Sequence, residues 1–387
     1  MGRLLNADDG LFLTWHFSLF SSLYNRLIRS SRRTLDPSKA SLFIIPYDLA
    51  LDGYVNPSRC SVRRSCTKGL AKAVEENVTS SSYWQKYKGA DHVLLWSLGQ
   101  YHPWPHERCD VLMREICERC TITSYWMDAT KQNNRFVSVP FPSAYHYHDD
   151  IKNLPWSTSK SMNRNQTAVY LGGIQTLNPT HTKIRRAMTE QCKANFLDCH
   201  WYQISHTSVD NQIADYLGHY KKSVFCLCPP GDDPARKAVF DSILSGCIPV
   251  IFELNTLYNQ YPYNLGEQNA RDISVYIPGG ALRSGAVKFM DVLRDIKPEV
   301  VKKKQALIAK LAPIMQYSAP PLKVLENRND QATWDPPFED GVDAILNGIF
   351  IRSSRIIANE SNHNFHRYMT GKAWGKEYNK VLVQEPK

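Results

Sequence analysis

The chain has 387 residues, which at about 150 residues per domain predicts two domains, each large enough to bury its own core. Apolar residues make up 43% of the chain, and 19 glycines with 22 prolines are not an excess, so disordered, collagen-like and small disulfide-stapled proteins are excluded. The net charge of +10 favours an anionic partner such as a nucleic acid, a phosphate group, a nucleotide or an acidic polysaccharide, and does not choose among them.

Short apolar runs alternate with helical patterns along the chain. The runs are typical of buried strands and occupy residues 41–48, 92–99, 168–173, 223–229, 247–252 and 273–278. The helical patterns fall at residues 182–195, 235–245, 285–296 and 298–315. Because strands that alternate with helices form parallel sheets covered on both faces, the expected fold class is α/β.

A polar stretch at residues 145–167, interrupted by Pro155, is the most linker-like part of the chain. We therefore expect an N-terminal domain over residues 1–150, a linker over 151–166, a second domain over 167–330 and a C-terminal extension over 331–387. Apolar residues at helical spacing predict one helix in this extension, over residues 338–350.

Ten cysteines and three Asn-x-Ser/Thr sequons together favour an oxidising, lumenal compartment. The sequons begin at Asn77, Asn165 and Asn359. Two cysteine pairs are close in sequence, Cys192 with Cys199 and Cys60 with Cys66, and residues 117–120 form a lone CxxC, but the connectivity stays open. No apolar run near the start reaches the roughly 20 residues of a membrane span, so we expect no anchor or signal peptide here.

The segment VFCLCPPGDDPARKAVFDSILSGCIPVIF, residues 224–252, reads as strand, loop, helix and strand. Asp233 is a natural N-cap, Pro234 suits the first helical position, and Gly246 closes the helix. The spacing therefore predicts a helix that begins near Ala235.

Two cations, Arg236 and Lys237, would stand in the first turn of this helix, where each opposes the helix dipole at a cost of about 0.3 to 1 kcal/mol. A diphosphate bound there would reverse the sign of that interaction. Asp241, one turn later, is placed to reach a ribose hydroxyl, as acidic residues do in other nucleotide-binding α/β units. The alternative is an ion pair between Lys237 and Asp241, worth only about 0.2 to 0.5 kcal/mol.

These residues closely resemble the exostosin-like glycosyltransferases, and within them the plant branch that contains xyloglucan galactosyltransferases. The resemblance is carried by residues 33–54, 89–92, 224–252, 258–265, 274–278 and 292–321. Residues 89–92, Gly-Ala-Asp-His, are similar to the family's Gly-x-Asp-His motif, and the whole resemblance covers residues 15–350.

The resemblance implies a GT-B-like enzyme, with two Rossmann-like domains facing a cleft, that transfers a sugar from a UDP-sugar donor to a glycan acceptor with inversion. It places Arg236 at the diphosphate, Lys237 where a second arginine is common, and Asp241 at the ribose. Lys237 departs from the family pattern because lysine offers a point charge where arginine offers a fork.

The loop at residues 171–175 also departs from the family. Gly172 and Gly173 open this loop, but Gln175 stands where the family often has an arginine. We therefore expect Arg185, on the following helix, to assist Arg236 in binding the phosphates.

The chemistry needs a base for the acceptor hydroxyl and positive charge for the leaving diphosphate. Since no Asp-x-Asp or HExxH motif occurs, we expect no metal site and no cofactor. The candidates for the base are Asp91, His92 and Asp48, each at or beside the end of a predicted N-terminal strand, where loops should face the cleft between the domains. Asp91 and His92 can equally cap a turn, and Asp48 a turn or a helix.

Three tyrosines, Tyr258, Tyr261 and Tyr263, follow a predicted strand in the second domain and are candidates for stacking on the acceptor sugar. Aromatic residues at this density are also common in protein cores.

The leading hypothesis is a Golgi glycosyltransferase of polysaccharide synthesis. The first candidate for its reaction is β-galactosyl transfer to a xyloglucan-like acceptor. The alternatives are glucuronosyl or xylosyl transfer to heparan- or xylan-like chains, or a non-catalytic glycan-binding module. Nucleic-acid binding is not expected, since no basic recognition helix is present. Membrane association would need an anchor outside this sequence.

Overall fold

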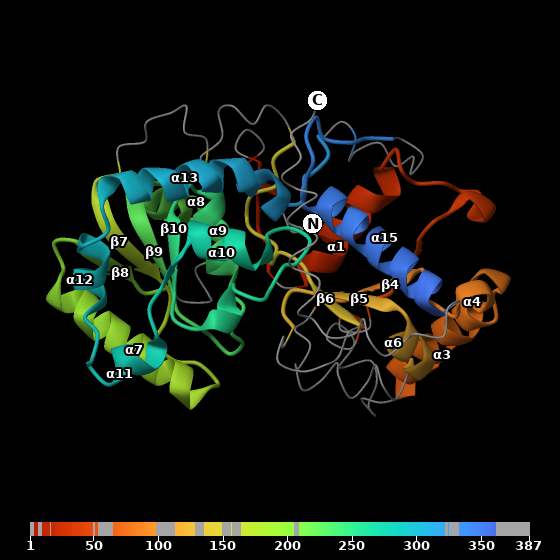
Figure 1. The fold of residues 1–387 in the computed structure, drawn as a ribbon, viewed down its shortest axis with the longest axis horizontal. Helices are drawn as coiled ribbons and strands as arrows, with labels where there is room; N and C mark the ends of the chain where they lie inside the picture. The colour runs from red at the N-terminus through yellow and green to blue at the C-terminus, as the bar shows by residue number, and fades with distance from the viewer. Residues whose placement is uncertain are drawn as a thin grey trace.

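A computed structural model describes residues 4–6, 10–15, 17–48, 51–52, 65–97, 113–127, 135–148, 156, 164–204, 209–321, 324 and 333–360. These residues form two lobes, each built around a parallel sheet (Figure 1). The α/β class with two parallel-sheet units is therefore confirmed.

The N-terminal lobe contains a four-stranded parallel sheet. Its strand order is β3 (Phe43–Ile45), β4 (His92–Leu95), β5 (Thr121–Ser124) and β6 (Phe136–Ser138). Its helices are α1 (Ser18–Arg29), α3 (Ser65–Thr79), α4 (Ser82–Tyr87) and α6 (Arg114–Arg119), with a short 3-10 helix at Pro37–Lys39. All four residues of β4 are buried, as expected for a strand covered on both faces.

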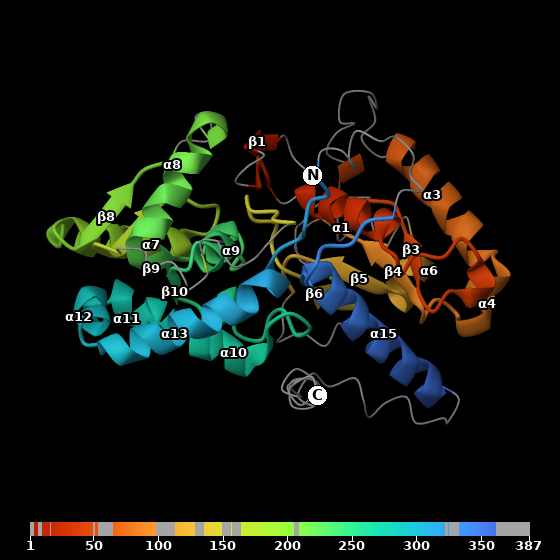
Figure 2. The same cartoon turned by 90° about the horizontal axis from the view of Figure 1, so that it is seen from above.

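The C-terminal lobe contains a five-stranded parallel sheet. Its order is β11 (Val275–Tyr276), β10 (Ile248–Ile251), β9 (Ser223–Cys228), β7 (Gln166–Leu171) and β8 (Cys199–Tyr202). The helices α8 (Val209–Lys222) and α9 (Lys237–Leu244) lie on one side. On the other side lie α7 (Pro179–Ala194), α10 (Gly266–Ile273), α11 (Gly279–Arg283), α12 (Phe289–Arg294) and α13 (Pro298–Leu311), with 3-10 turns at Leu254–Thr256 and Ala312–Met315 (Figure 2).

Each end of the described chain crosses to the opposite lobe. The N-terminal end packs on the C-terminal lobe, and the C-terminal end packs on the N-terminal lobe. The antiparallel pair β1 (Leu4–Asn6) and β2 (Leu11–Phe12) places Leu11 in the core of the C-terminal lobe. After the second sheet, α15 (Gly341–Glu360) returns to the N-terminal lobe, where Ile345 and Ile349 join its core (Figure 1). Helix α15 begins and ends later than the helix predicted at residues 338–350. The division of the chain into four parts stays a prediction.

Arg26 of α1 anchors this returning segment. Its guanidinium is 1% exposed and lies 2.6 Å from Asp335, 3.3 Å from Asp340 and 3.1 Å from Asp343. Burial raises the pKa of Asp340 to about 6, against the opposing charge of Arg26. One buried cation therefore balances three carboxylates, two of them buried with it.

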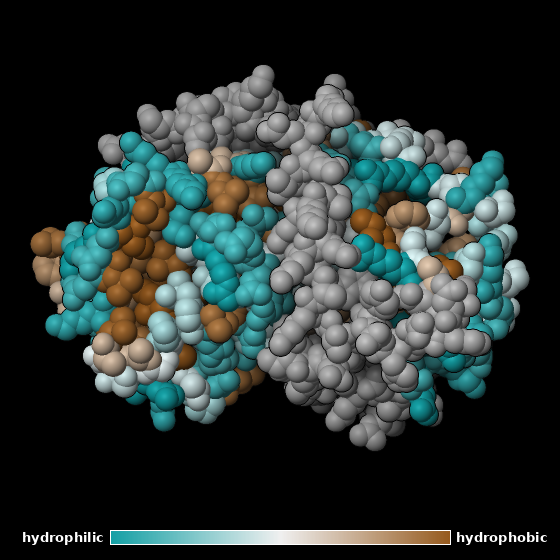
Figure 3. All heavy atoms as spheres, in the orientation of Figure 1, coloured by the Kyte–Doolittle hydropathy of each residue, from teal (hydrophilic) through white to brown (hydrophobic). Residues whose placement is uncertain are grey.

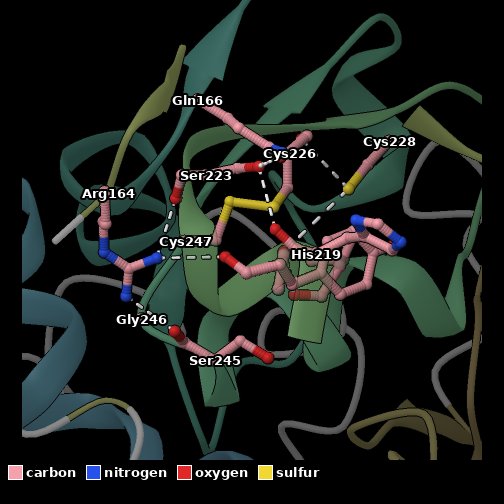
Figure 4. The surroundings of a disulfide bond; sticks show 12 residues. Arg164, Gln166, His219, Ser223, Cys226, Cys228, Ser245, Gly246 and Cys247 are labelled. Atoms are coloured by element: carbon pink, nitrogen blue, oxygen red, sulfur yellow. Dashed lines mark hydrogen bonds between the residues drawn. A yellow bond between two sulfur atoms is a disulfide. The ribbon is translucent and has the colours of Figure 1, made fainter. Parts of the chain in front are cut away.

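Two disulfides join neighbouring elements of the C-terminal lobe. Cys192 at the end of α7 pairs with Cys199 at the start of β8, one of the two pairs considered from the sequence. Cys226 of β9 pairs with Cys247, just before β10 (Figure 4). Cys117 is disulfide-bonded while Cys120 is free, so the CxxC does not pair with itself.

On the face shown in Figure 3, hydrophilic residues surround an apolar stripe on the C-terminal lobe between α12 and α10. Among these residues we find no helix that combines the length and the apolar character needed to cross a membrane. The side chains of Cys60 and Cys66 are outside the described part of the structure, so their predicted pairing stays a prediction.

Replacing Arg26 with alanine should lower the free energy of unfolding by about 3 to 5 kcal/mol, because it leaves buried carboxylates without their counter-charge. Arg32→Ala is the control: Arg32 is exposed, its guanidinium lies 3.8 Å from Asp343, and its loss should cost less than about 1 kcal/mol. Chemical denaturation measures both. Equal losses in the two variants would contradict the anchoring role of Arg26.

Candidate functional site

The order of the C-terminal sheet reverses between β7 and β9. From β7 the chain proceeds to β8 on one side, and the following strands β9, β10 and β11 lie on the other. The loops that leave β7 and β9 therefore diverge, and ligands of open α/β sheets bind in the crevice at such a point, outside the carboxyl ends of the strands. These two loops are residues 172–178 and 229–236.

Two arginines flank Gly231 in this crevice. Arg185 of α7 is buried, and its Nε donates to the carbonyl of Pro230 at 2.7 Å while its Nη1 donates to the carbonyl of Gly173 at 3.0 Å. A Cβ on Gly231 would lie 1.8 Å from Nη1 of Arg236 and 3.1 Å from Nη2 of Arg185. A side chain at this position would therefore displace the Arg236 guanidinium from its place beside Gly231.

The two arginines carry like charges without a direct ion pair among the described residues. Among the described residues, neither Arg185 nor Arg236 forms an ion pair with a carboxylate. Burial, with the added charge of Arg236, lowers the pKa of Arg185 to about 10. Two like charges held together in a crevice are destabilising unless an anion joins them, so the pair is suited to bind an anion.

His181 lies beside the arginines and contacts the same glycine. Its Nδ1 donates to the carbonyl of Gly231 at 2.5 Å, and its Nε2 lies 2.9 Å from Oε1 of Glu253. Burial alone would lower the pKa of His181, but the hydrogen bonds to Glu253 and Gly231 raise it above its usual value. Nothing in the sequence singled out His181 or Glu253, because their contact joins α7 to the segment after β10.

Gly172 and Gly173 shape the loop that leaves β7. The carbonyl of Gly173 accepts hydrogen bonds from Arg185 and from the hydroxyl of Tyr170, the latter at 2.6 Å. The carbonyl of Gly172 accepts from Nε1 of Trp201 at 2.9 Å. The structure thus brings Gly172, Gly173, Arg185 and Arg236 together around one crevice.

Helix α9 begins at Lys237, later than predicted, with Arg236 as its N-cap residue and no side-chain cap. The prediction of Asp233 as the N-cap is wrong because other partners hold this residue. Its carboxylate accepts from the hydroxyl of Tyr125 at 2.9 Å, and its carbonyl accepts from Gly231 N at 3.0 Å. Arg236 therefore stands where the loop enters the helix, and not inside its first turn.

Asp241 of α9 is buried in the C-terminal lobe. Its Oδ2 lies 2.7 Å from Nζ of Lys237, which is the ion pair considered as the alternative from the sequence. Its Oδ1 accepts from Oγ of Ser143 at 2.6 Å and from N of Ala144 at 3.1 Å. Both oxygens thus serve contacts within the protein, and a ribose contact stays a prediction.

A family model described as the Exostosin GT47 domain matches residues 10–291. The chain belongs to the exostosin GT47 family. The crevice with its arginine pair lies within the matched residues.

Curated relatives from Arabidopsis thaliana carry two activities in their names. A "Probable xyloglucan galactosyltransferase GT20" is 29% identical over 325 residues, which cover 81% of this chain and 55% of the relative. A "Xyloglucan-specific galacturonosyltransferase 1" is 27% identical over 283 residues, covering 71% of this chain and 41% of the relative. The chain therefore spans about half the length of these two relatives.

A solved structure, described as a glycosyltransferase from Rickettsia africae, aligns with 76% of this chain and 81% of its own at a TM-score of 0.33 and 9% identity. We draw no argument from a similarity this low.

The carboxyl edge of the N-terminal sheet faces the C-terminal lobe of this GT47 chain. Besides the bond from Tyr125, after β5, to Asp233, backbone N of Met127 donates to Oε1 of Gln260 at 3.2 Å. At the end of β6, Oγ of Ser138 accepts from N of Tyr261 at 2.9 Å. Groups that act on a ligand shared by both lobes should therefore lie at this edge.

The base candidates lie at opposite edges of that sheet. Asp48 follows β3 at the carboxyl edge and is buried, and its Oδ1 accepts from N of Leu51 at 3.3 Å. Asp91 and His92 lie at the amino end of β4, where Oδ1 of Asp91 is 2.7 Å from Nδ1 of His92. The expectation that this pair faces the cleft is wrong, because His92 is stacked on Phe43 inside the lobe.

The three tyrosines proposed for the acceptor are core residues. Tyr261 is fully buried, and its hydroxyl donates to the carbonyl of Tyr125 at 3.2 Å. Tyr258 is buried and hydrogen-bonded to Ser274 at 3.1 Å. Tyr263 packs against α15 so tightly that a Cβ on Gly348 would lie 2.2 Å from its ring. None presents a ring face to solvent, so their placement in an acceptor groove is wrong.

The contact between His181 and Glu253 can be tested by measuring the pKa of His181 in solution. In nuclear magnetic resonance titrations, His181 should titrate above the ordinary value of about 6.5, and Glu253→Gln should lower its pKa because the partner charge is removed. His219, whose pKa burial lowers, is the control and should not move. A His181 pKa that is the same with and without the Glu253 carboxylate would contradict the ion pair.

Proposed function

We propose that this chain is an inverting glycosyltransferase that moves a sugar from a UDP-sugar to a glycan acceptor. Two observations support the proposal: membership of the exostosin GT47 family and the adjacent arginines Arg185 and Arg236 at the point where the sheet order reverses. The arginine pair is the observation that carries the proposal, because a nucleoside diphosphate is the anion that this position of an α/β sheet suits best.

Positive charge at this position would act on the leaving group. As the bond from the anomeric carbon to the diphosphate breaks, negative charge grows on the phosphate oxygens, and guanidinium groups already in place stabilise it without reorganisation. Arg185 is held by two backbone carbonyls, so its guanidinium is fixed before the donor binds. This supply of charge supports the proposal that transfer needs no metal.

We propose Asp48 as the base that takes the proton of the acceptor hydroxyl. It stands at the edge of the N-terminal sheet that faces the C-terminal lobe, whereas Asp91 and His92 lie at the opposite edge. A carboxylate near the cleft can accept this proton as the hydroxyl attacks.

For the transferred sugar, β-galactosyl transfer to a xyloglucan-like polysaccharide remains the first candidate. The galacturonosyltransferase among the relatives adds UDP-galacturonic acid to the donors to be tested, beside UDP-glucuronic acid and UDP-xylose. The disulfides of the C-terminal lobe support a lumenal site of action, for which we propose the Golgi.

Arg236→Ala should weaken UDP binding by about 10- to 100-fold, the loss expected for a charge-assisted hydrogen bond of about 1.5 to 3 kcal/mol. Isothermal titration calorimetry measures the affinity, and circular dichroism confirms that the fold survives. Arg186→Ala is the matched control, because Arg186 is an exposed neighbour of Arg185 on the same helix. UDP affinity that is unchanged in Arg236→Ala, or reduced equally in Arg186→Ala, would contradict the proposal.

A further inference from the structure

We infer that His181 is a positioning residue of the donor site, which holds the carbonyl of Gly231 and thereby fixes the turn against which the guanidinium of Arg236 lies. This inference rests on the proposed function, since it concerns how the same diphosphate site is kept in shape. In this role His181 acts through Arg236 and does not itself touch the donor.

The turn that carries Gly231 lies outside any helix or strand. It connects the end of β9 at Cys228 to the start of α9 at Lys237, and α9 begins without a side-chain cap. Within the turn, N of Gly231 donates to the carbonyl of Asp233 at 3.0 Å. The carbonyls of Pro230 and Gly231 are held from outside the turn, by two side chains of α7.

These two carbonyls accept from one face of α7. Nε of Arg185 donates to Pro230 at 2.7 Å, and Nδ1 of His181 donates to Gly231 at 2.5 Å. The two side chains are four residues apart, which places them on the same side of the helix. A rotation of the Gly231 peptide would break its bond to His181 and move the backbone on which the Arg236 guanidinium lies.

The carbonyl of Gly231 also determines which ring nitrogen of His181 carries a proton. A carbonyl oxygen only accepts, so Nδ1 must be the donor. Nε2 then lies between two partners, 2.9 Å from Oε1 of Glu253 and 3.2 Å from Nδ2 of Asn178. The protonated ring donates to Glu253, and the neutral ring accepts from Asn178. The bond to Gly231 is therefore kept in both charge states of His181.

Close packing between α7 and the end of β10 places Glu253 beside His181. A Cβ on Gly279, at the start of α11, would lie 2.7 Å from Cδ1 of Ile184 in α7 and 2.9 Å from the carbonyl oxygen of Phe252. Ile184 comes three residues after His181, and Phe252 directly precedes Glu253. The imidazole is thus held from the end of a neighbouring strand as well as by its own helix.

Two substitutions separate the contacts of His181. The amide nitrogen of asparagine reaches about as far as Nδ1 of histidine, and that of glutamine about as far as Nε2. His181→Asn can therefore keep the donor to Gly231, whereas His181→Gln loses it and can keep the contact with Glu253. His219→Gln is the matched control, because His219 lies in the last turn of α8, before the amino end of β9 and opposite the crevice.

Isothermal titration calorimetry with UDP and thermal melting compare these variants with the wild type. We expect His181→Gln to weaken UDP binding about tenfold, and His181→Asn and His219→Gln to stay within about threefold. The two His181 variants should melt at similar temperatures. A merely structural role would instead weaken UDP binding equally in both, since each removes the same imidazole.

Action through Arg236 is tested by combining substitutions. Adding His181→Gln to Arg236→Ala should weaken UDP binding by no more than about threefold beyond Arg236→Ala alone, because the group that His181 positions is already gone. General loosening of the lobe would add its full effect to that of Arg236→Ala.

A measurement on the wild type needs no substitution, and so decides the matter even where a variant does not fold. The nitrogen-15 chemical shifts of the His181 ring should show the neutral ring protonated at Nδ1.

The outcomes separate the two claims. Wild-type protein that binds no UDP overturns the proposed function, and this inference with it. If the wild type binds UDP, three results overturn the inference alone: equal UDP affinity in the two His181 variants, full addition of the losses in the double variant, or a neutral ring protonated at Nε2.

Discussion

Two guanidinium groups held side by side at Gly231, neither in a direct ion pair with a carboxylate among the described residues, are the constraint on which the site depends. Their repulsion has a free-energy cost in the empty protein, and the surrounding structure is arranged to sustain it. Carbonyls of Pro230 and Gly173 hold Arg185, and the His181–Glu253 pair holds Gly231. A site that stores positive charge in this way is prepared for a diphosphate before one arrives.

The same loops also join the two lobes. Asp233 accepts from Tyr125 across the lobes, and Asp241 accepts from Ser143, whose neighbour Ala144 belongs to the C-terminal core. This explains why these carboxylates do not neutralise Arg236. The chain ends strengthen the connection, because α15 returns to the N-terminal lobe and is anchored there by Arg26. The position of one lobe against the other is thus set close to the proposed donor site.

The sequence predicted the parts of the fold that local pattern determines. All six apolar runs proved to be strands, since buried parallel strands are continuously apolar. It missed β5, Thr-Ile-Thr-Ser, and β8, Cys-His-Trp-Tyr, because polar residues interrupt these strands. It identified the arginines through the family motif. It could not foresee the burial of Tyr261 or the His181–Glu253 contact, which arise only when segments distant in sequence pack together.

The central claim is that the crevice between β7 and β9 holds the diphosphate of a nucleotide. A crystal structure of the protein with bound UDP tests it most directly. The account predicts phosphate oxygens within hydrogen-bond distance of the guanidinium groups of both Arg185 and Arg236, above Gly231. UDP bound elsewhere, or Arg236 turned away from the phosphates toward a carboxylate, would contradict it.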